Sequence, residues 1–559
     1  MKSIKITVFA LFVSLIGYSQ NAATKQTVMV KMPDGVQLST DIFSPEKEGV
    51  YPVILIRTPY NKIQHQEEGY FFANNNYIVI IQDSRGSFES EGEMTPFLNE
   101  EKDGLATLDW ILDQKWCNGN VGLWGSSYLS YAAFVIAQHN PKAIKSLFVI
   151  SGWLKGDKVL HPGGTFHLQL SLPWMLYSKS FKGTEKRYDY KKLFKTTPTD
   201  SLFDALGIYA NFLKERRAGN SSFDANYKPK NIKAPMFHIT GWNDFVKDAH
   251  LDLYGKTKNS KSLHKLMIGP WGHDQIYTDK TTVGDEDFGS QSVLGRTALN
   301  KLGLNWFDYT LKGKSNSIDD KAATTVFVMG ENSWRTFDNY PPKEVRNRKF
   351  YLSSTNGANG VQGDGQLLSN PKSQNSIDHF TYNPHDPVPT FGGANFHFFP
   401  SLLGVKNRAE IQKRSDVLVY TGEALKEDLV VIGNVKVNLN VATQGKDTDF
   451  TATLSEVQKD GYVRIISEGI IRLGNRKGVD QRTLVSPGTF LKVSIDMGNT
   501  GIKIKKGNQL RLEVSSSNFP KYDRNPNTGV DPFEASTFIS VEQSVRLGKN
   551  SFLTLPVLK

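Results

Sequence analysis

The chain has almost no cysteine: Cys117 is the only one among 559 residues. A single thiol cannot form an internal disulfide, so the fold must be stabilised by the burial of its core alone. The neighbours Trp116 and Val121 predict that this thiol is buried, and we assign it no catalytic role.

Long apolar runs are also lacking, except near the N-terminus. Lys2 and Lys5 precede the apolar run Ile6–Ile16, which is too short to span a membrane and is followed by small residues. This pattern is typical of a secretory signal peptide, and we expect cleavage near Ser19 or Gln20. No cysteine follows the run, so a lipid anchor is not expected. The mature protein is predicted to be periplasmic or extracellular, without stable membrane insertion.

Dense tracts of Lys and Arg are the third absence. The formal net charge is +11, and removal of the predicted signal with its two lysines leaves +9. The excess is spread along the chain, which argues against a nucleic-acid partner. It could favour an anionic substrate, but a solvated basic exterior is the preferred interpretation. The length predicts two or three domains, and an apolar content of 39% is that of an ordinary globular protein.

The N-terminal part of the mature chain alternates between apolar runs and helical patterns. After a hairpin over 27–43, we expect strands at 52–57, 77–83, 144–151, 235–240, 264–268 and 325–329, and helices at 101–114 and 292–311. This order predicts a mostly parallel sheet with helices on both faces, and active groups at the carboxyl ends of its strands.

Two segments with other sequence patterns interrupt or follow this alternation. From Gly152 to about Lys230 the sequence is rich in aromatic residues with helical spacing, which indicates an inserted helical cap. Beyond about Pro342, short strands recur between Gly, Asn, Asp and Pro residues. Examples lie at 348–352, 417–420, 429–442, 450–457, 463–472, 490–495 and 509–514. This spacing is typical of an all-β sandwich or jelly roll.

The stretch Val121–Tyr131 is the most informative in the chain. Its first part can form a buried strand, which breaks at Gly125 and continues as a helix after Ser127. A serine on a sharp strand-to-helix turn is the nucleophile elbow of α/β-hydrolases, G-x-S-x-G. The second glycine of that pattern is Leu129 here, so the match is imperfect. The alternative is a helix N-terminus in which Ser126 or Ser127 is only an N-cap.

A serine nucleophile needs a base and an acid that orients the base, in the chain order Ser, Asp or Glu, His. Of the eleven histidines, His273 lies on a loop directly after the predicted strand 264–268. Asp244 follows strand 235–240 in the same way, so the two can meet at one sheet edge. Asp248 is the rival acid, interpreted otherwise as surface charge. His238, inside an apolar strand, is interpreted as a core histidine with satisfied hydrogen bonds.

An oxyanion hole needs two donors. The backbone N–H of Tyr128, directly after the nucleophile, supplies one. The hydroxyl of Tyr60, after strand 52–57, is a candidate for the second, although a packing tyrosine is the preferred interpretation from the sequence pattern alone.

Several motifs together resemble one family. They are Arg57-Thr-Pro-Tyr60, Gln82-Asp-Ser-Arg-Gly86 with Glu91-Gly-Glu93, Asp109-Trp-Ile111 with Trp116-Cys-Asn-Gly-Asn-Val-Gly122, Gly125-Ser-Ser-Tyr128, Gly241-Trp-Asn-Asp244 and Gly269-Pro-Trp-Gly-His273. Over nearly the whole mature chain, the sequence resembles the family of cocaine esterases, α-amino-acid ester hydrolases and glutaryl-7-aminocephalosporanic acid acylases, related to X-prolyl dipeptidyl peptidases.

The resemblance implies Ser127 as nucleophile, Asp244 as triad acid and His273 as base, with Tyr60 and the N–H of Tyr128 as the oxyanion hole. Two departures matter. Ser130 replaces the last glycine of the family motif, a small change that should be tolerated.

The second departure concerns the substrate amine. Acidic residues two and three places after the triad Asp help to hold that amine in α-amino-acid ester hydrolases, and these places are Val246 and Lys247 here. The exchange argues against α-amino esters and against peptides with a free N-terminus.

We therefore predict an α/β fold: an α/β-hydrolase domain with an inserted helical cap and a C-terminal all-β jelly-roll domain. The expected boundaries are 1–20 for the signal peptide, 21–152 and 231–342 for the two parts of the hydrolase domain, 153–230 for the cap and 343–559 for the β-sandwich.

The predicted function is that of a secreted serine hydrolase that cleaves carboxylic esters through an acyl-enzyme, with amides as the second candidate bond. The first alternative is an X-Pro dipeptidyl peptidase or acylase. The second alternative is a glycan-binding protein on a degenerate hydrolase scaffold. No metal or cofactor is expected, and the partner is a small or oligomeric ester or amide; a homo-oligomer is left open. Candidate pocket walls are Trp153, Trp174, Trp242 and Phe245.

Overall fold

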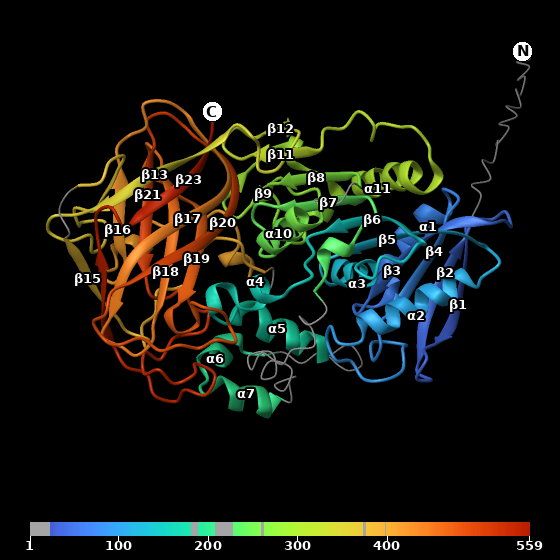
Figure 1. Cartoon of the computed structure of the whole chain (residues 1–559), viewed down its shortest axis with the longest axis horizontal. Helices are drawn as coiled ribbons and strands as arrows, with labels where there is room; N and C mark the ends of the chain where they lie inside the picture. The colour runs from blue at the N-terminus through green and yellow to red at the C-terminus, as the bar shows by residue number, and fades with distance from the viewer. Residues whose placement is uncertain (1–22, 180–187, 207–226, 259–261, 373–375, 397–398) are drawn as a thin grey trace, which may run out of the picture.

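The computed structural model describes residues 23–179, 188–206, 227–258, 262–372, 376–396 and 399–559. The predicted signal peptide lies outside these residues. Within the described ranges, no helix combines the length and the apolar character needed to cross a membrane. The chain forms an α/β domain and an all-β domain that lie side by side (Figure 1).

A ten-stranded sheet forms the centre of the α/β domain. Its strand order is β1 (Thr24–Lys31), β2 (Gln37–Ser44), β4 (Ile78–Asp83), β3 (Tyr51–Thr58), β5 (Cys117–Ser126), β6 (Ile144–Ile150), β7 (Met236–Gly241), β8 (His264–Gly269), β11 (Thr324–Val328) and β12 (Ser333–Phe337). The strands from β4 to β11 pair in parallel, and the remaining pairs are antiparallel. The predicted mostly parallel sheet is confirmed.

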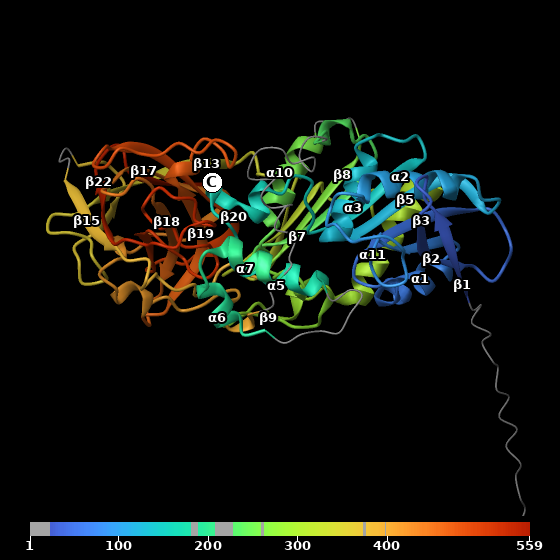
Figure 2. The same ribbon diagram turned by 90° about the horizontal axis from the view of Figure 1, so that it is seen from below.

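Helices cover both faces of this sheet. Helices α1 (Gln66–Ala73) and α11 (Gly295–Lys312) lie on one face, and α2 (Glu100–Leu112), α3 (Tyr128–Ala137) and α10 (Lys247–Thr257) on the other (Figure 2). Every residue of β4 is buried, which explains why its sequence is a continuous apolar run without alternation. The sequence pattern missed α1 and β12.

Four described helices lie between β6 and β7, where the cap is expected: α4 (Asp157–Leu160), α5 (Leu168–Lys179), α6 (Tyr190–Lys195) and α7 (Thr199–Leu206). They sit beside the junction of the two domains (Figure 1). Part of the predicted cap lies outside the described residues, and the domain boundaries remain predictions.

The C-terminal domain is all-β, as predicted, with one eleven-stranded sheet. Its strands are β13 (Val345–Ser353), β14 (Gln366–Leu368), β15 (Ile377–Tyr382), β16 (Leu418–Gly422), β17 (Leu429–Thr443), β18 (Asp449–Val457), β19 (Val463–Arg472), β20 (Leu491–Ile504), β21 (Gln509–Ser515), β22 (Val541–Arg546) and β23 (Phe552–Leu558). The jelly-roll topology itself remains a prediction. The short or late strands β14, β15, β22 and β23 are not among those expected from the sequence.

Contacts from the loop after β7 and from α10 tie the two domains together. The Trp242 side chain is buried in an apolar cluster to which both domains contribute, where it packs against Gly501 of β20. Its indole N–H donates to the carbonyl of Phe327 on β11 at 2.6 Å. Asp248 accepts hydrogen bonds from the backbone and side-chain amides of Asn499 at 2.7 and 2.8 Å. The interpretation of Asp248 as surface charge is therefore wrong, because this carboxylate joins α10 to β20.

The environment of Cys117 also differs from the prediction. The residue is half-buried rather than buried, because it begins β5 at the edge of the core. Its Sγ accepts the N–H of Gly119 at 3.3 Å. Partial burial raises the pKa of the thiol.

Three buried histidines lie in contact between the sheet and α10, on β7, β8 and α10. His238 on β7 is fully buried, with its ring centroid 5.2 Å from that of His250 and 5.7 Å from that of His264. His238 Nδ1 lies 3.3 Å from His250 Nε2, whereas its Nε2 has no hydrogen-bond partner among the described residues. His238 is a core histidine as predicted, but its hydrogen bonds are only partly satisfied. Burial lowers the pKa of all three rings, to about 4 for His250 and His264.

These histidines predict a loss of stability in mild acid. Below about pH 6.5 these histidines are protonated in the unfolded chain but stay neutral in the folded protein. The free energy of unfolding therefore falls as the pH falls from about 6.5 towards 4. His264→Gln keeps a hydrogen-bonding side chain near Ser262 but cannot be protonated in this range. We expect the difference in melting temperature between pH 7 and pH 5 to be smaller in this variant than in the wild type, by differential scanning calorimetry. An equal difference in both proteins would contradict the role of His264.

Candidate active site

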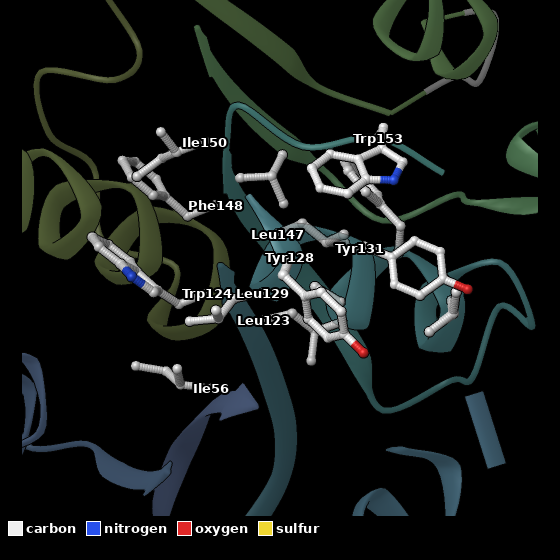
Figure 3. Close-up of a cluster of buried hydrophobic side chains, with 14 of the residues drawn as sticks. Ile56, Leu123, Trp124, Tyr128, Leu129, Tyr131, Leu147, Phe148, Ile150 and Trp153 are labelled. Carbon is white, nitrogen blue, oxygen red and sulfur yellow. The ribbon is translucent and has the colours of Figure 1, made fainter. Parts of the chain in front are cut away.

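The strand-to-helix turn is as sharp as its sequence indicates. Strand β5 ends at Ser126 and α3 begins at Tyr128, which leaves Ser127 between them at φ 55° and ψ −121°. Such a positive φ is strained for a residue with a side chain, and this strain exposes the hydroxyl at the top of the sheet. A Cβ on Gly125 would lie 2.4 Å from the backbone of Leu129, so only glycine fits there. Buried side chains, among them Leu123, Trp124 and Tyr128, pack on both sides of the turn (Figure 3).

Ser130, which stands where the family motif has glycine, is accommodated in the turn. Its Oγ lies 2.7 Å from the carbonyl oxygen of Gly125 and accepts the N–H of Ile150 at 3.2 Å. The hydroxyl therefore links the turn to the neighbouring strand β6.

The structure brings Ser127, His273 and Asp244 together. Ser127 Oγ lies 2.8 Å from His273 Nε2, and His273 Nδ1 lies 2.9 Å from Asp244 Oδ1. The same Asp244 oxygen accepts the N–H of Val246 at 3.0 Å, which orients the carboxylate. Asp244 and His273 are almost completely buried, so this chain of hydrogen bonds is shielded from bulk water.

Two loops that follow β7 and β8 hold the acid and the base. The N–H of Trp242 donates to the carbonyl of Gly269 at 2.8 Å, and the N–H of Asn243 to that of Trp271 at 3.0 Å. A Cβ on Gly241 would lie 2.1 Å from the carbonyl oxygen of Trp271, so this close approach requires glycine. The two glycine-rich motifs are thus partners in one loop pair.

The pKa of His273, the predicted base, is subject to opposing effects. Burial by itself lowers the pKa of His273, but the charge and hydrogen bond of Asp244, together with the charge of Asp274, outweigh it and raise this pKa above its ordinary value. The imidazole is therefore a stronger base than a free histidine, which suits the removal of a serine proton.

Both predicted oxyanion groups lie beside Ser127. Tyr60 lines the same cavity, and its hydroxyl accepts the indole N–H of Trp174 at 2.9 Å. Burial raises the pKa of Tyr60 well above its ordinary value, so the phenol stays protonated and keeps an O–H to donate. Tyr128 is the first residue of α3, where backbone N–H groups have no acceptor within the helix.

A cavity of about 400 Å³ opens above Ser127, and it includes only one of the four predicted wall residues, Trp174. Phe245 lies behind the base, with its ring centroid 4.6 Å from that of His273. Trp153 is buried against Phe97, and Trp242 lies in the apolar cluster that the two domains share.

A second cavity of about 230 Å³, at the junction with the all-β domain, is lined by Trp242 and Phe245 instead. The sequence pattern missed the other walls of the Ser127 cavity, notably Glu68, Tyr177, Tyr277, Arg296 and Phe396. Their positions in the sequence carry no shared spacing that could have revealed them.

Comparisons with known proteins agree with this architecture. Residues 34–275 match the family model of the X-Pro dipeptidyl-peptidase (S15 family), and residues 316–553 match the X-Pro dipeptidyl-peptidase C-terminal non-catalytic domain. The cocaine esterase of Rhodococcus sp. (strain MB1 Bresler) is 31% identical over 541 residues, which cover 91% of this chain and 93% of the esterase.

The chain belongs to the cocaine esterase family of hydrolases. The resemblance inferred from the motifs is thereby confirmed. Solved structures support the fold. An aminopeptidase from the marine sediment archaeon Thaumarchaeota archaeon has a TM-score of 0.82 at 21% identity, with 100% of this chain and 99% of that chain covered. An α-amino acid ester hydrolase has a TM-score of 0.81 at 22% identity, with 99% and 98% covered.

The close packing of Gly125 yields a prediction for the site. Gly125→Ala places a methyl group against the Leu129 backbone and must displace Ser127, so we expect ester turnover to fall by about 100-fold, as for a misplaced nucleophile. The matched control is Gly255→Ala on α10, where a Cβ meets no atom within 4 Å. Turnover is measured with 4-nitrophenyl acetate. If Gly125→Ala keeps the activity of Gly255→Ala, the turn does not position the reactive group.

Proposed function

We propose that the protein is a serine hydrolase that cleaves carboxylic esters through an acyl-enzyme. The observation that carries this proposal is the hydrogen-bonded chain from Ser127 Oγ through His273 to Asp244, built on a strained turn at the floor of a cavity. Membership in a family of esterases and peptidases supports the same reaction class.

The proposed mechanism assigns one step to each group. His273 Nε2 accepts the proton of Ser127 Oγ as the oxygen attacks the ester carbonyl, and later donates that proton to the departing alcohol. Asp244 holds the Nδ1–H tautomer and stabilises the imidazolium that forms. The Tyr60 hydroxyl and the N–H of Tyr128 bind the oxyanion. Water, activated by the same imidazole, then releases the acid from Ser127.

Amide-cleaving functions remain the alternative, because the family model bears the name of X-Pro dipeptidyl peptidases. The site offers no acid at the two places where α-amino-acid ester hydrolases hold the substrate amine. Val246 is fully buried there, and Lys247 Nζ lies 3.2 Å from Asp248 Oδ2. This arrangement favours esters over substrates with a free N-terminus.

The test compares the wild type with Ser127→Ala on 4-nitrophenyl acetate and on an X-Pro 4-nitroanilide. We expect the wild type to cleave the ester faster, and the variant to lose about 10⁴-fold or more, because the nucleophile is gone and only binding and the oxyanion hole remain. Unchanged turnover in Ser127→Ala would refute the assignment. Faster cleavage of the anilide would favour the peptidase. Retention on glycans without labelling by a fluorophosphonate would favour the glycan-binding alternative.

We also propose that the protein is exported, on the pattern of its first twenty residues. The mature protein recovered from outside the cytoplasm is expected to begin near Gln20 or Asn21, which N-terminal sequencing measures. A chain that is recovered only in the cytoplasm and still begins at Met1 would contradict export. The lack of a nucleic-acid partner and the question of a homo-oligomer remain at the level of prediction.

A further inference from the structure

One end of the Ser127 cavity carries a pair of opposite charges that the proposed mechanism does not use. Arg296, near the start of α11, places Nη1 2.6 Å from Glu68 Oε1, and both residues line the cavity. The guanidinium also lies 5.6 Å from the ring centroid of Tyr277, which hydrogen-bonds the side chain of Ser126. The pair is thus connected to the residue next to the nucleophile.

Each member of the pair has hydrogen-bonding capacity left over. The Glu68 side chain is 2% exposed, and its buried Oε2 has no hydrogen-bond partner in another described residue. Arg296 donates from Nη1 to Glu68, whereas its Nε lies 3.7 Å from Glu67 Oε2, which is an ion-pair contact beyond hydrogen-bond distance. The Arg296 side chain is 36% exposed and therefore accessible from the cavity.

The charges at this end disfavour an anionic ligand. The carboxylates of Glu67 and Glu68 already compensate Arg296, so a substrate carboxylate would compete with both of them. A substrate ammonium would meet the guanidinium here but also two carboxylates, so a cationic ester is the main competitor of a neutral one. Burial and the field of Arg296 lower the pKa of His65 to about 4, so that ring adds no charge at neutral pH. Asp274 also lines the cavity, and its exposed position screens its negative charge only in part, since this charge helps to raise the pKa of His273.

Hydroxyl groups suit such a pair because each can accept from the guanidinium and donate to the carboxylate without a change in net charge. The remaining walls are aromatic. Trp174, Tyr177 and Tyr277 border the same cavity, and Tyr177 stacks on Tyr60 with ring centroids 6.4 Å apart. Flat aromatic faces beside a few planar polar groups suit a rigid ring that is apolar on its faces and polar at its edge.

We propose that Arg296 and Glu68 form a subsite for a neutral polyhydroxylated group, so that the preferred substrates are acyl esters of carbohydrates. This inference rests on the proposed esterase function and names its substrate class. Arg296 is a specificity-determining residue in this arrangement, and the Glu68 carboxylate compensates the positive charge of Arg296.

The experiment uses four acetate esters that differ only in the alcohol. They are methyl 6-O-acetylglucopyranoside, cyclohexylmethyl acetate of similar shape without hydroxyls, acetylcholine with a cation, and O-acetyl-lactate with a carboxylate. Acetate release by the full-length protein gives kcat/KM for each. We expect the glucoside ester to be the best of the four in the wild type.

Arg296→Met keeps the aliphatic stem and removes the donors. We expect the ratio of kcat/KM for the glucoside ester to that for cyclohexylmethyl acetate to fall about 10- to 100-fold, which is the size expected for lost hydrogen bonds to a charged group. Glu68→Gln leaves Arg296 less compensated and should raise the relative rate of O-acetyl-lactate. Arg348→Met, an exposed arginine on β13 of the all-β domain, is the matched control and should leave every ratio unchanged.

The outcomes separate this inference from the function on which it rests. If all four esters are cleaved in a Ser127-dependent way, but the cation or the carboxylate ester ranks first, the subsite is wrong while the esterase stands. A ratio in Arg296→Met within about twofold of the wild type has the same meaning. If Arg296→Met does not fold, Arg296→Lys, which keeps the charge but loses the planar fork, must still lower the ratio. If none of the esters is cleaved, the proposed function itself fails and the subsite with it.

Discussion

The site depends on the contact between the loops that follow β7 and β8. Gly241 lies so close to the carbonyl of Trp271 that a Cβ would be only 2.1 Å from that oxygen. Backbone hydrogen bonds from Trp242 and Asn243 extend this contact and set the 2.9 Å distance between His273 Nδ1 and Asp244 Oδ1. A parallel sheet places both loops at the same edge, beside the turn that carries the serine.

The all-β domain and the helical segment contribute to the same region. Trp242 packs in an apolar cluster to which both domains contribute, against Gly501 on one side and with a hydrogen bond to Phe327 on the other, so the loop that carries Asp244 is held from both domains. Trp174 on α5 reaches the hydroxyl of Tyr60, and Phe396 closes the cavity from the C-terminal side. The reactive groups thus come from the hydrolase domain, whereas the walls come from three parts of the chain. Substrate preference can therefore change without a change in the chemistry.

Local sequence patterns predicted the structure correctly wherever the backbone conformation requires a particular type of residue. The buried strands, the elbow at Gly125 and the loops that carry Asp244 and His273 were placed correctly, because tight turns require glycine and buried strands require apolar runs. The same reasoning placed only Trp174 of the four proposed wall residues correctly at the Ser127 cavity. Trp242 and Phe245 line the second cavity instead, and Trp153 packs in the core. From the sequence alone, an aromatic residue that fills a core cannot be told from one that lines a cavity. Asp248 was misjudged because its partner Asn499 is far away in the sequence.

The amino-acid sequence alone was enough to predict the parallel sheet, the two-part architecture, the family and the three residues of the predicted triad, although it missed α1, β12 and four strands of the all-β domain. Each of these features can be recognised from neighbouring residues, because a tight turn requires glycine, a buried strand requires an apolar run, and a catalytic loop requires a short motif. Which side chains face Ser127 is seen only in the folded chain. The pairing of Arg296 with Glu68 joins residues on α11 and α1 that have no common pattern. Such a contact depends on how two helices far apart in the sequence pack side by side on one face of the sheet, and neither residue has a neighbour in the chain that indicates it.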